Sequence, residues 1–173
     1  RIFFKMNLLI LGMPNVGKTS LFNLITSVND NIIHKTSGTT RDWHVGYLKN
    51  NLGINIYDTP GIILEENKLV DKNLKNLINK IDIFVYVLDY KKNNYFNDKE
   101  IINFFRKFNK EIILIVNKDD NLNQDKNLEK LGFQDIFYLS CSHKLGLDRL
   151  LNFLTKFETT NIFNDKTNFS IGL

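Results

Sequence analysis

The residues best suited to chemistry form one short stretch near the start of the chain, Gly12 to Thr19, which reads Gly-Met-Pro-Asn-Val-Gly-Lys-Thr. This stretch fits the phosphate-binding pattern G-x-x-x-x-G-K-[ST]. Glycines at both ends let the backbone turn and bring its N–H groups close to an anion. The Lys18 ammonium would neutralise β- and γ-phosphate charge, and the Thr19 hydroxyl would bind Mg²⁺. The expected phosphate site comprises Gly12, Met13, Pro14, Asn15, Val16, Gly17, Lys18 and Thr19.

The surroundings of this stretch favour a binding loop over an ordinary glycine turn that happens to carry a lysine. The apolar run Leu8 to Leu11 precedes it, and an amphipathic, helix-like segment follows it. A loop between a strand and a helix directs the helix N-terminus at the anion, where the helix dipole favours negative charge.

A second polar motif, Asp58-Thr59-Pro60-Gly61, ends a later apolar run. Asp58 can reach the magnesium shell, and the Gly61 N–H can contact the γ-phosphate. Taken alone the motif could be a strand-ending turn, but a phosphate loop upstream makes that alternative weaker. A hydroxyl of Thr39 or Thr40 could complete the shell when a γ-phosphate is bound, and we favour Thr40. The expected Mg²⁺ ligands are Thr19, Thr40 and Asp58, and the expected nucleotide contacts of this motif are Asp58, Thr59, Pro60, Gly61 and Ile62.

A third motif, Asn117-Lys118-Asp119-Asp120, follows the apolar run Ile112 to Val116 and fits the pattern N-K-x-D. A carboxylate can accept hydrogen bonds from the ring N–H and the exocyclic amine of guanine together, whereas adenine presents no such pair of donors. We therefore predict that Asp120 selects GTP and GDP. Asp119, at the variable position, is expected to be a solvated surface charge.

The neighbours of Asp120 complete the expected base site. Asn117 would brace the base and the phosphate loop, and the Lys118 stem would cover a face of the base. Ser140-Cys141-Ser142 follows the last apolar run, and the Cys141 backbone N–H could reach the base oxygen. The Cys141 side chain is expected to be small and buried and not a reactive thiol.

Short apolar runs alternate with helix-like segments, which is typical of an α/β fold with a mostly parallel sheet covered on both faces. The turn formers from Lys49 to Gly53 predict an antiparallel hairpin. Asn29–Trp43 and Thr59–Leu69 show no regular pattern, as expected of functional loops. The predicted strands are Asn7–Leu11, His44–Leu48, Ile54–Asp58, Ile83–Leu88, Glu111–Val116 and Ile136–Leu139. The predicted helices are Lys18–Val28, Val70–Asn79, Asn97–Phe108, Lys126–Leu131 and Leu147–Phe157.

Length, charge and cysteine content narrow the class of protein. The chain has 173 residues, 43% of them hydrophobic, which suffices for one core. A net charge of +4 could indicate an RNA partner, but lysine outnumbers arginine nineteen to four and the lysines are scattered, so we interpret most as ordinary surface. One cysteine cannot form an internal disulfide, and no apolar run approaches the roughly 20 residues of a membrane span. We expect a cytoplasmic protein without a membrane partner.

In order and spacing, Gly-x-Pro-Asn-x-Gly-Lys-Thr, Gly-Thr-Thr-Arg-Asp, Asp-Thr-Pro-Gly, Asn-Lys-x-Asp and Ser-Cys resemble the motifs of translation-factor-class G proteins. Within that class the chain is similar to the Der family, also called EngA, of tandem-domain ribosome-assembly GTPases. Leu131-Gly132-Phe133 and Ile136 to Ser140 resemble the end of that family's first G domain. The resemblance implies a three-layer P-loop G domain with a six-stranded, mostly parallel sheet, one antiparallel edge pair and helices on both faces.

The resemblance also divides the chain. Residues 6–157 are expected to form the G domain, after an N-terminal extension or remnant at 1–5. Residues 158–167 are expected to be a linker and 168–173 the start of a truncated second G domain, with frayed polar disorder as the alternative for this tail. The MnmE family of tRNA-modification GTPases is the alternative family, although its members usually carry alanine at the position of Pro60.

Hydrolysis must proceed without one group that Ras-like proteins use. Those proteins orient the attacking water with a glutamine, and this chain has Ile62 at that position. The family suggests K⁺ instead, because proteins with asparagine at the position of Asn15 often bind K⁺ beside the phosphates, with carbonyl oxygens from the loop before Thr39. Bracing of its own loop is the alternative role for Asn15. The residues expected to act in hydrolysis are Lys18, Asn15, Thr40 and Gly61.

The resemblance further implies a switch. Loss of the γ-phosphate would release Thr40 and Gly61, and in the Der family this change controls docking on the large ribosomal subunit and its rRNA during late assembly. The alternative is a module that binds GTP but hydrolyses little of it.

Overall fold

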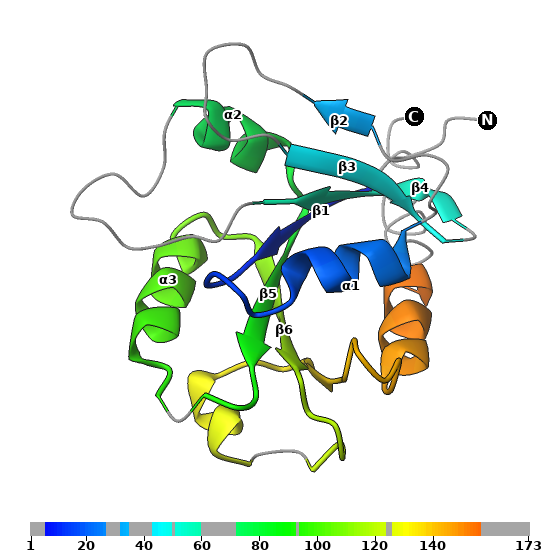
Figure 1. Ribbon diagram of the computed structural model, residues 1–173. Helices are drawn as coiled ribbons and strands as arrows, with labels where there is room; N and C mark the ends of the chain where they lie inside the picture. The colour runs from blue at the N-terminus through cyan, green and yellow to red at the C-terminus, as the bar shows by residue number, and fades with distance from the viewer. Residues whose placement is uncertain are drawn as a thin grey trace, which may run out of the picture.

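A seven-stranded sheet forms the centre of the protein in the computed structural model, which describes residues 6–26, 32–34, 43–49, 51–59, 72–92, 94–123 and 126–156 (Figure 1). The spatial order of the strands is β2-β3-β4-β1-β5-β6-β7. Their bounds are β1 (Met6–Leu11), β2 (Ile32–His34), β3 (Trp43–Leu48), β4 (Asn51–Asp58), β5 (Ile83–Asp89), β6 (Glu111–Asn117) and β7 (Ile136–Tyr138).

The sheet is parallel from β4 to β7 and antiparallel at its other edge. β1 lies between β4 and β5 and is parallel to both, and β5, β6 and β7 continue in the same direction. β3 pairs antiparallel with β4 and with β2. The expected mostly parallel α/β fold is confirmed. The structure adds a seventh short strand, β2, within the segment that showed no regular pattern.

The hairpin between β3 and β4 is tighter than expected. Leu48 pairs with Asn51, so the turn formers after position 50 belong to β4 and not to the turn. The register also shifts between Tyr47 and Leu48, which allows the pairing to end in a short connection.

Two hydrophobic cores lie on opposite faces of the sheet because side chains alternate along each strand. Leu8 and Ile10 of β1 belong to one core, and Leu9 and Leu11 belong to the other. All seven residues of β5 are buried, as expected of a central strand of a parallel sheet covered on both faces.

Helices supply the two outer layers. α1 (Lys18–Ile25) and the helical residues 147–156, orange in Figure 1, pack on the first core. α2 (Lys72–Lys80) and α3 (Phe96–Arg106) pack on the second. The apolar side chains that reach the cores from these helices include Leu21, Phe22, Ile25, Leu150 and Leu154 on one face and Leu74, Ile78, Ile101, Ile102 and Phe105 on the other.

Two helical expectations need correction. The segment Lys126–Leu131 is a 3-10 helix and not an α-helix, and the Gly132 N–H closes it with a 3.0 Å bond to the Glu129 carbonyl three residues back. α1 ends at Ile25 because Thr26 is extended and pairs with Leu48. Within the described ranges, no helix combines the length and the apolar character that crossing a membrane requires.

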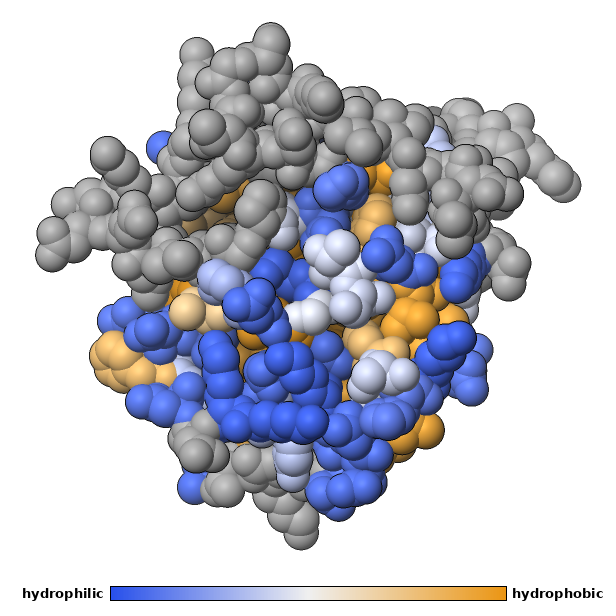
Figure 2. Space-filling view, in the orientation of Figure 1, coloured by the Kyte–Doolittle hydropathy of each residue, from blue (hydrophilic) through white to orange (hydrophobic). Residues whose placement is uncertain are grey.

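The carboxyl ends of the five parallel strands lie at the same end of the sheet. After β1, the chain adds β3 and β4 on one side of β1 and then β5 and β6 on the other side. This change of side is a topological switch point, and α/β proteins bind ligands at the carboxyl ends of the strands beside it. In the same view hydrophilic side chains predominate at the centre of the lower half of the molecule, toward which β5 and β6 run (Figure 2).

Candidate nucleotide-binding site

The loop between β1 and α1 has a backbone that only glycine can adopt at two positions. Gly12 has φ 144°, and a Cβ there would lie 2.5 Å from the Val87 carbonyl oxygen. Gly17 has φ 97°, and a Cβ there would overlap the Asn117 side-chain nitrogen. The two glycines therefore let the loop pack directly on β5 and on the end of β6, with the N-terminus of α1 as its exit.

Lys18 is held inside this loop and not extended into solvent. Its side chain is buried, and its ammonium donates a 2.8 Å hydrogen bond to the Met13 carbonyl. Burial lowers the pKa of Lys18, and the nearby Asp58 carboxylate opposes that shift. The cation is thus fixed under the loop backbone, where a phosphate would face both the ammonium and the N–H groups.

Asp58 and Thr19 form a pair of oxygen ligands suited to Mg²⁺. The Thr19 hydroxyl donates a 2.8 Å bond to Asp58 Oδ2, while Asp58 Oδ1 is buried and has no hydrogen-bond partner among the described residues. Burial raises the pKa of Asp58, opposed by the Thr19 bond and the Lys18 charge. A buried carboxylate oxygen without a partner beside a hydroxyl fits a hard divalent cation. Thr59 fixes the end of β4, because its hydroxyl donates to the Ile10 carbonyl at 2.7 Å.

Asn117, the last residue of β6, connects three segments. Its side-chain nitrogen donates a 2.9 Å bond to the Val16 carbonyl of the phosphate loop. Its side-chain oxygen accepts a 3.0 Å bond from the Cys141 N–H. The bond to Val16 thus provides the contact through which Asn117 can brace the phosphate loop. Here the Cys141 N–H donates to Asn117, and its contact with the base oxygen stays a prediction.

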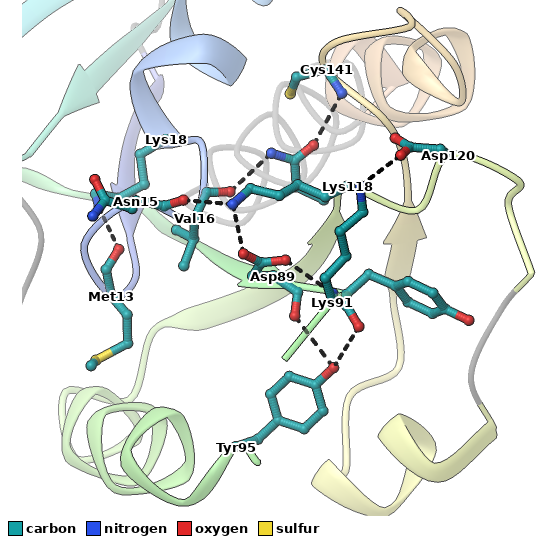
Figure 3. Close-up of polar contacts among 12 residues, drawn as sticks. Met13, Asn15, Val16, Lys18, Asp89, Lys91, Tyr95, Lys118, Asp120 and Cys141 are labelled. Carbon is teal, nitrogen blue, oxygen red and sulfur yellow. Dashed lines mark hydrogen bonds and ion pairs between the residues drawn. The ribbon is translucent and has the colours of Figure 1, made fainter. Parts of the chain in front are cut away.

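Lys118 spans the site between the phosphate loop and β5 (Figure 3). Its backbone lies in the left-handed region, with φ 68°, and its ammonium donates to the Asn15 carbonyl at 2.8 Å and to Asp89 Oδ2 at 2.6 Å. The stem of Lys118 therefore lies along one side of the pocket. Asp89 was not among the expected residues, although its place as the first acidic residue after the apolar run of β5 could have indicated it.

Asp120 is a half-buried carboxylate at the mouth of the site. Oδ2 accepts a 2.8 Å bond from the Lys91 ammonium, and Oδ1 accepts a 2.7 Å bond from the Ser140 hydroxyl. These two donors, Lys91 first, hold the pKa of Asp120 below its usual range. Asp120 is therefore ionised and oriented, as the acceptor of two N–H groups must be.

The expectation for Asp119 was wrong. Its side chain is completely buried, and Oδ1 accepts a 3.0 Å bond from the Asn123 N–H. The two neighbouring aspartates therefore have opposite environments: Asp119 is buried in the turn after β6, and Asp120 points out of it toward the pocket.

A cavity of about 310 Å³ lies between the phosphate loop and Asp120. Its size is within the range of small-molecule sites. Cys141 forms part of its wall, and burial raises the pKa of that thiol to about 11, so it is an unreactive apolar surface as expected. A second cavity of about 490 Å³ lies on the other side of Lys118. The smaller one is lined by Gly17, Ser20, Leu24, Lys91, Asn117, Lys118, Asp120, Cys141 and Ser142, and it fits a base attached to a phosphate at Gly17.

Several expected site residues lie outside the described residues: Thr40, Pro60, Gly61 and Ile62. The same holds for the proposed linker and second-domain segment after residue 156.

The geometry agrees with comparisons to known proteins. The family described as "50S ribosome-binding GTPase" matches residues 7–118. The GTPase Der of a Nitratiruptor species is 38% identical over 154 residues, which cover 85% of this chain and 33% of the relative. The GTPase Der of Malacoplasma penetrans is 30% identical over 173 residues, covering 91% of this chain and 38% of the relative. The chain thus spans 33% to 38% of the length of these relatives.

Solved structures give the same result for the fold. A mutant of NFeoB from S. thermophilus bound to GDP superimposes with a TM-score of 0.69 at 25% identity, covering 85% of this chain and 59% of the other. Era in complex with MgGDPNP and a segment of 16S ribosomal RNA superimposes with a TM-score of 0.62 at 26% identity, covering 87% and 56%. Because the family match extends from β1 through the phosphate loop and Asp58 to Lys118, the chain is a GTPase domain and belongs to the family of 50S ribosome-binding GTPases.

Proposed function

We propose that this chain is the first GTP-binding domain of a Der-type GTPase and acts as a switch in assembly of the large ribosomal subunit in the cytoplasm. The names of the relatives and the share of their length that the chain spans support this proposal. So does the tail at residues 168–173, which resembles the first strand of another G domain. A second phosphate loop encoded after Leu173 would agree with the proposal, whereas a helical region with a terminal cysteine would indicate the MnmE type.

The observation that carries the nucleotide assignment is the side chain of Asn117. It joins Val16 of the phosphate loop to Cys141 of the base pocket through two hydrogen bonds of 2.9 and 3.0 Å. One ligand that occupies both sites must therefore combine a phosphate chain with a base. Asp120, an ionised pair of acceptors at the pocket mouth, fits guanine.

In the proposed mechanism, Lys18 neutralises charge on the β- and γ-phosphates from beneath the loop. Thr19 and Asp58 would hold Mg²⁺ through a hydroxyl and a carboxylate, Asp58 through its second oxygen or through water. When bound, Mg²⁺ would supply positive charge that offsets the negative charge of the phosphates. Thr40 is proposed to complete the Mg²⁺ shell and Gly61 to contact the γ-phosphate, and loss of that phosphate would release both contacts. Thr59 anchors the second motif to β1.

Asn15 is proposed as a ligand of K⁺. Its side chain is exposed and makes no hydrogen bond within the described part of the chain, since only its backbone carbonyl is engaged, by Lys118. Its amide oxygen is therefore available beside the phosphates. A monovalent cation there would compensate for the missing glutamine at Ile62.

GTP hydrolysis by the purified chain, in matched K⁺ and Na⁺ buffers with Mg²⁺, tests the catalytic part. We expect faster turnover in K⁺, competition by GDP but not by ADP, and a loss of about 10²–10³-fold in Lys18→Ala. Equal rates in the two salts would refute the K⁺ role, and inhibition by ADP would refute the role of Asp120. Tight GTP binding with turnover equal to that of Lys18→Ala would identify a binding module.

Cosedimentation with large-subunit precursor particles tests the ribosomal part. The full-length protein should pellet with these particles when a non-hydrolysable GTP analogue is bound and remain in the supernatant with GDP. Equal recovery in both nucleotide states would count against a switch.

A further inference from the structure

Lys91 stands at the mouth of the base pocket with its backbone fixed and its side chain largely exposed. It follows β5 by two residues, and its N–H donates a 3.0 Å bond to Asp89 Oδ1. Its side chain is 62% exposed, and the ammonium reaches across to Asp120 Oδ2 at 2.8 Å (Figure 3). The contact joins two turns that are 29 residues apart in the sequence.

This ion pair forms part of the wall of the pocket. Both Lys91 and Asp120 line the cavity of about 310 Å³ between the phosphate loop and Ser142, and both also line the larger cavity beyond Lys118. The Lys91 ammonium therefore lies on the boundary between the base site and its surroundings.

The pairing occupies the atoms that must recognise the base. Guanine offers two parallel donors, a ring N–H and an amine, and Asp120 can accept both only if its oxygens face the pocket. The Ser140 hydroxyl takes one position on Oδ1, and a carboxylate oxygen has a second position for another donor. The Lys91 ammonium has donors only, so it competes with an incoming N–H group for the acceptor positions of Oδ2.

We infer that Lys91 is an affinity-determining residue that competes with the guanine base for the Asp120 carboxylate. The inference rests on the proposed role of Asp120 as the guanine reader. In the pair, Lys91 keeps Asp120 ionised and directed at the pocket mouth together with Ser140. Guanine then replaces the Lys91 ammonium and leaves the Ser140 bond in place.

The exposure of the Lys91–Asp120 pair determines how strongly Lys91 should lower the affinity for GDP. Exposed ion pairs are weak, so the paired and unpaired arrangements are populated within a small factor of one another. Apparent affinity falls by the fraction of molecules in which the carboxylate is paired. Removal of the ammonium should therefore tighten GDP binding by about two- to fivefold.

The test is GDP titration of the chain by calorimetry, with stopped-flow association as a second readout, at low and high salt. Lys91→Met should bind GDP about two- to fivefold tighter than wild type at low salt. Lys91→Arg preserves the pair and should behave as wild type. Lys92→Met is the matched control, because it removes the same charge one residue further along the chain; it should bind GDP no tighter than wild type. High salt should weaken the pair and reduce the advantage of Lys91→Met.

The outcomes separate this inference from the proposed function. Wild-type chain that binds ADP as well as GDP would refute the guanine site itself. Selective GDP binding by wild type, with Lys91→Met equal to or weaker than wild type, would overturn the Lys91 inference alone.

Discussion

The two ends of the nucleotide site differ in how deeply their charged side chains are buried. At the phosphate end, Lys18 and Asp58 are 6% and 4% exposed, and one Asp58 oxygen has no hydrogen-bond partner among the described residues. At the base end, Asp120 and Lys91 are 31% and 62% exposed in their side chains and bond to each other. Buried charges without full compensation are costly, whereas exposed pairs exchange easily.

This difference in burial indicates that the two ends have different roles in binding. The phosphate end is a rigid cradle whose buried groups gain partners when phosphate and Mg²⁺ bind. The base end is a set of exchangeable surface contacts that can select a base without large rearrangement. The Asn117 side chain is the rigid link between them.

The largest expected effect is at the base end. Asp120→Asn replaces one acceptor with an amide donor that faces the guanine amine, so GDP affinity should fall by about 10²-fold. Xanthine carries a carbonyl in place of that amine and should bind the variant better than guanine does. Competition between GDP and XDP for the variant measures the change.

Asp119→Asn is the matched control, since it makes the same change one residue earlier in a buried side chain. It should lower thermal stability and leave guanine selectivity intact. A loss of selectivity in this variant would mean that the turn as a whole, and not the exposed carboxylate, reads the base.

An intermediate effect is expected at the link between the two ends. Gly17→Ala combines an unfavourable φ with an overlap against Asn117, whereas Gly132→Ala has a similar positive φ of 71° but its Cβ would lie 3.7 Å from Arg106 Nη2. The unfavourable φ alone should cost about 1 kcal/mol of unfolding free energy, and the overlap should add about 1–3 kcal/mol. Urea denaturation of both variants measures the difference. Equal destabilisation of the two variants would show that the Asn117 side chain moves aside at little cost and is not a rigid connection between the two ends.

The smallest effect is expected from the charge at the phosphate end, and it depends on pH. Burial raises the pKa of Asp58, so the folded protein holds this proton more tightly than the unfolded chain does. The proton on Asp58 therefore stabilises the folded state. This stabilisation is fully present below the unfolded pKa of about 3.9 and is lost as the pH rises through the pKa of Asp58 in the folded state. At pH 7 without Mg²⁺ or nucleotide, Asp58→Asn should therefore be more stable by about 1 kcal/mol.

Thermal unfolding from acid to neutral pH checks this sign. The difference between Asp58→Asn and wild type should vanish at low pH, and Mg²⁺ with GTP should stabilise wild type more than the variant. A wild type more stable than the variant at pH 7 without ligand would mean that Lys18 and Thr19 already compensate the charge.

Much of this molecule could be predicted because local patterns determine it. The apolar runs predicted each of the six main strands, and Gly-x-x-x-x-Gly-Lys-Thr placed the loop between β1 and α1. Periodicity could not distinguish the 3-10 helix at Lys126 from an α-helix, because six residues are too few to separate a repeat of three residues from one of 3.6. It also could not predict the end of α1, which Leu48 fixes through a contact that is distant in sequence.

The base end was harder to predict because its charges depend on tertiary neighbours. Nothing local distinguishes Asp119 from Asp120, and the structure buries only the first. Asp89 and Lys91 carry no motif, and they enter the site because β5 lies beside β6. The motifs thus identified candidate site residues, whereas Asp89, Lys91 and the hydrogen-bond partners of each side chain could not be predicted from the sequence.

The brace provided by Asn117 also has a consequence for biosynthesis. The phosphate loop is translated before β6, and the side chain that holds it lies 101 residues downstream of Val16. A nascent chain that ends before β6 has the loop without its support, and contacts of such long sequence separation form late in folding. Acquisition of GTP binding should therefore not precede emergence of β6 from the ribosomal exit tunnel, so that translation itself limits when the switch becomes operational.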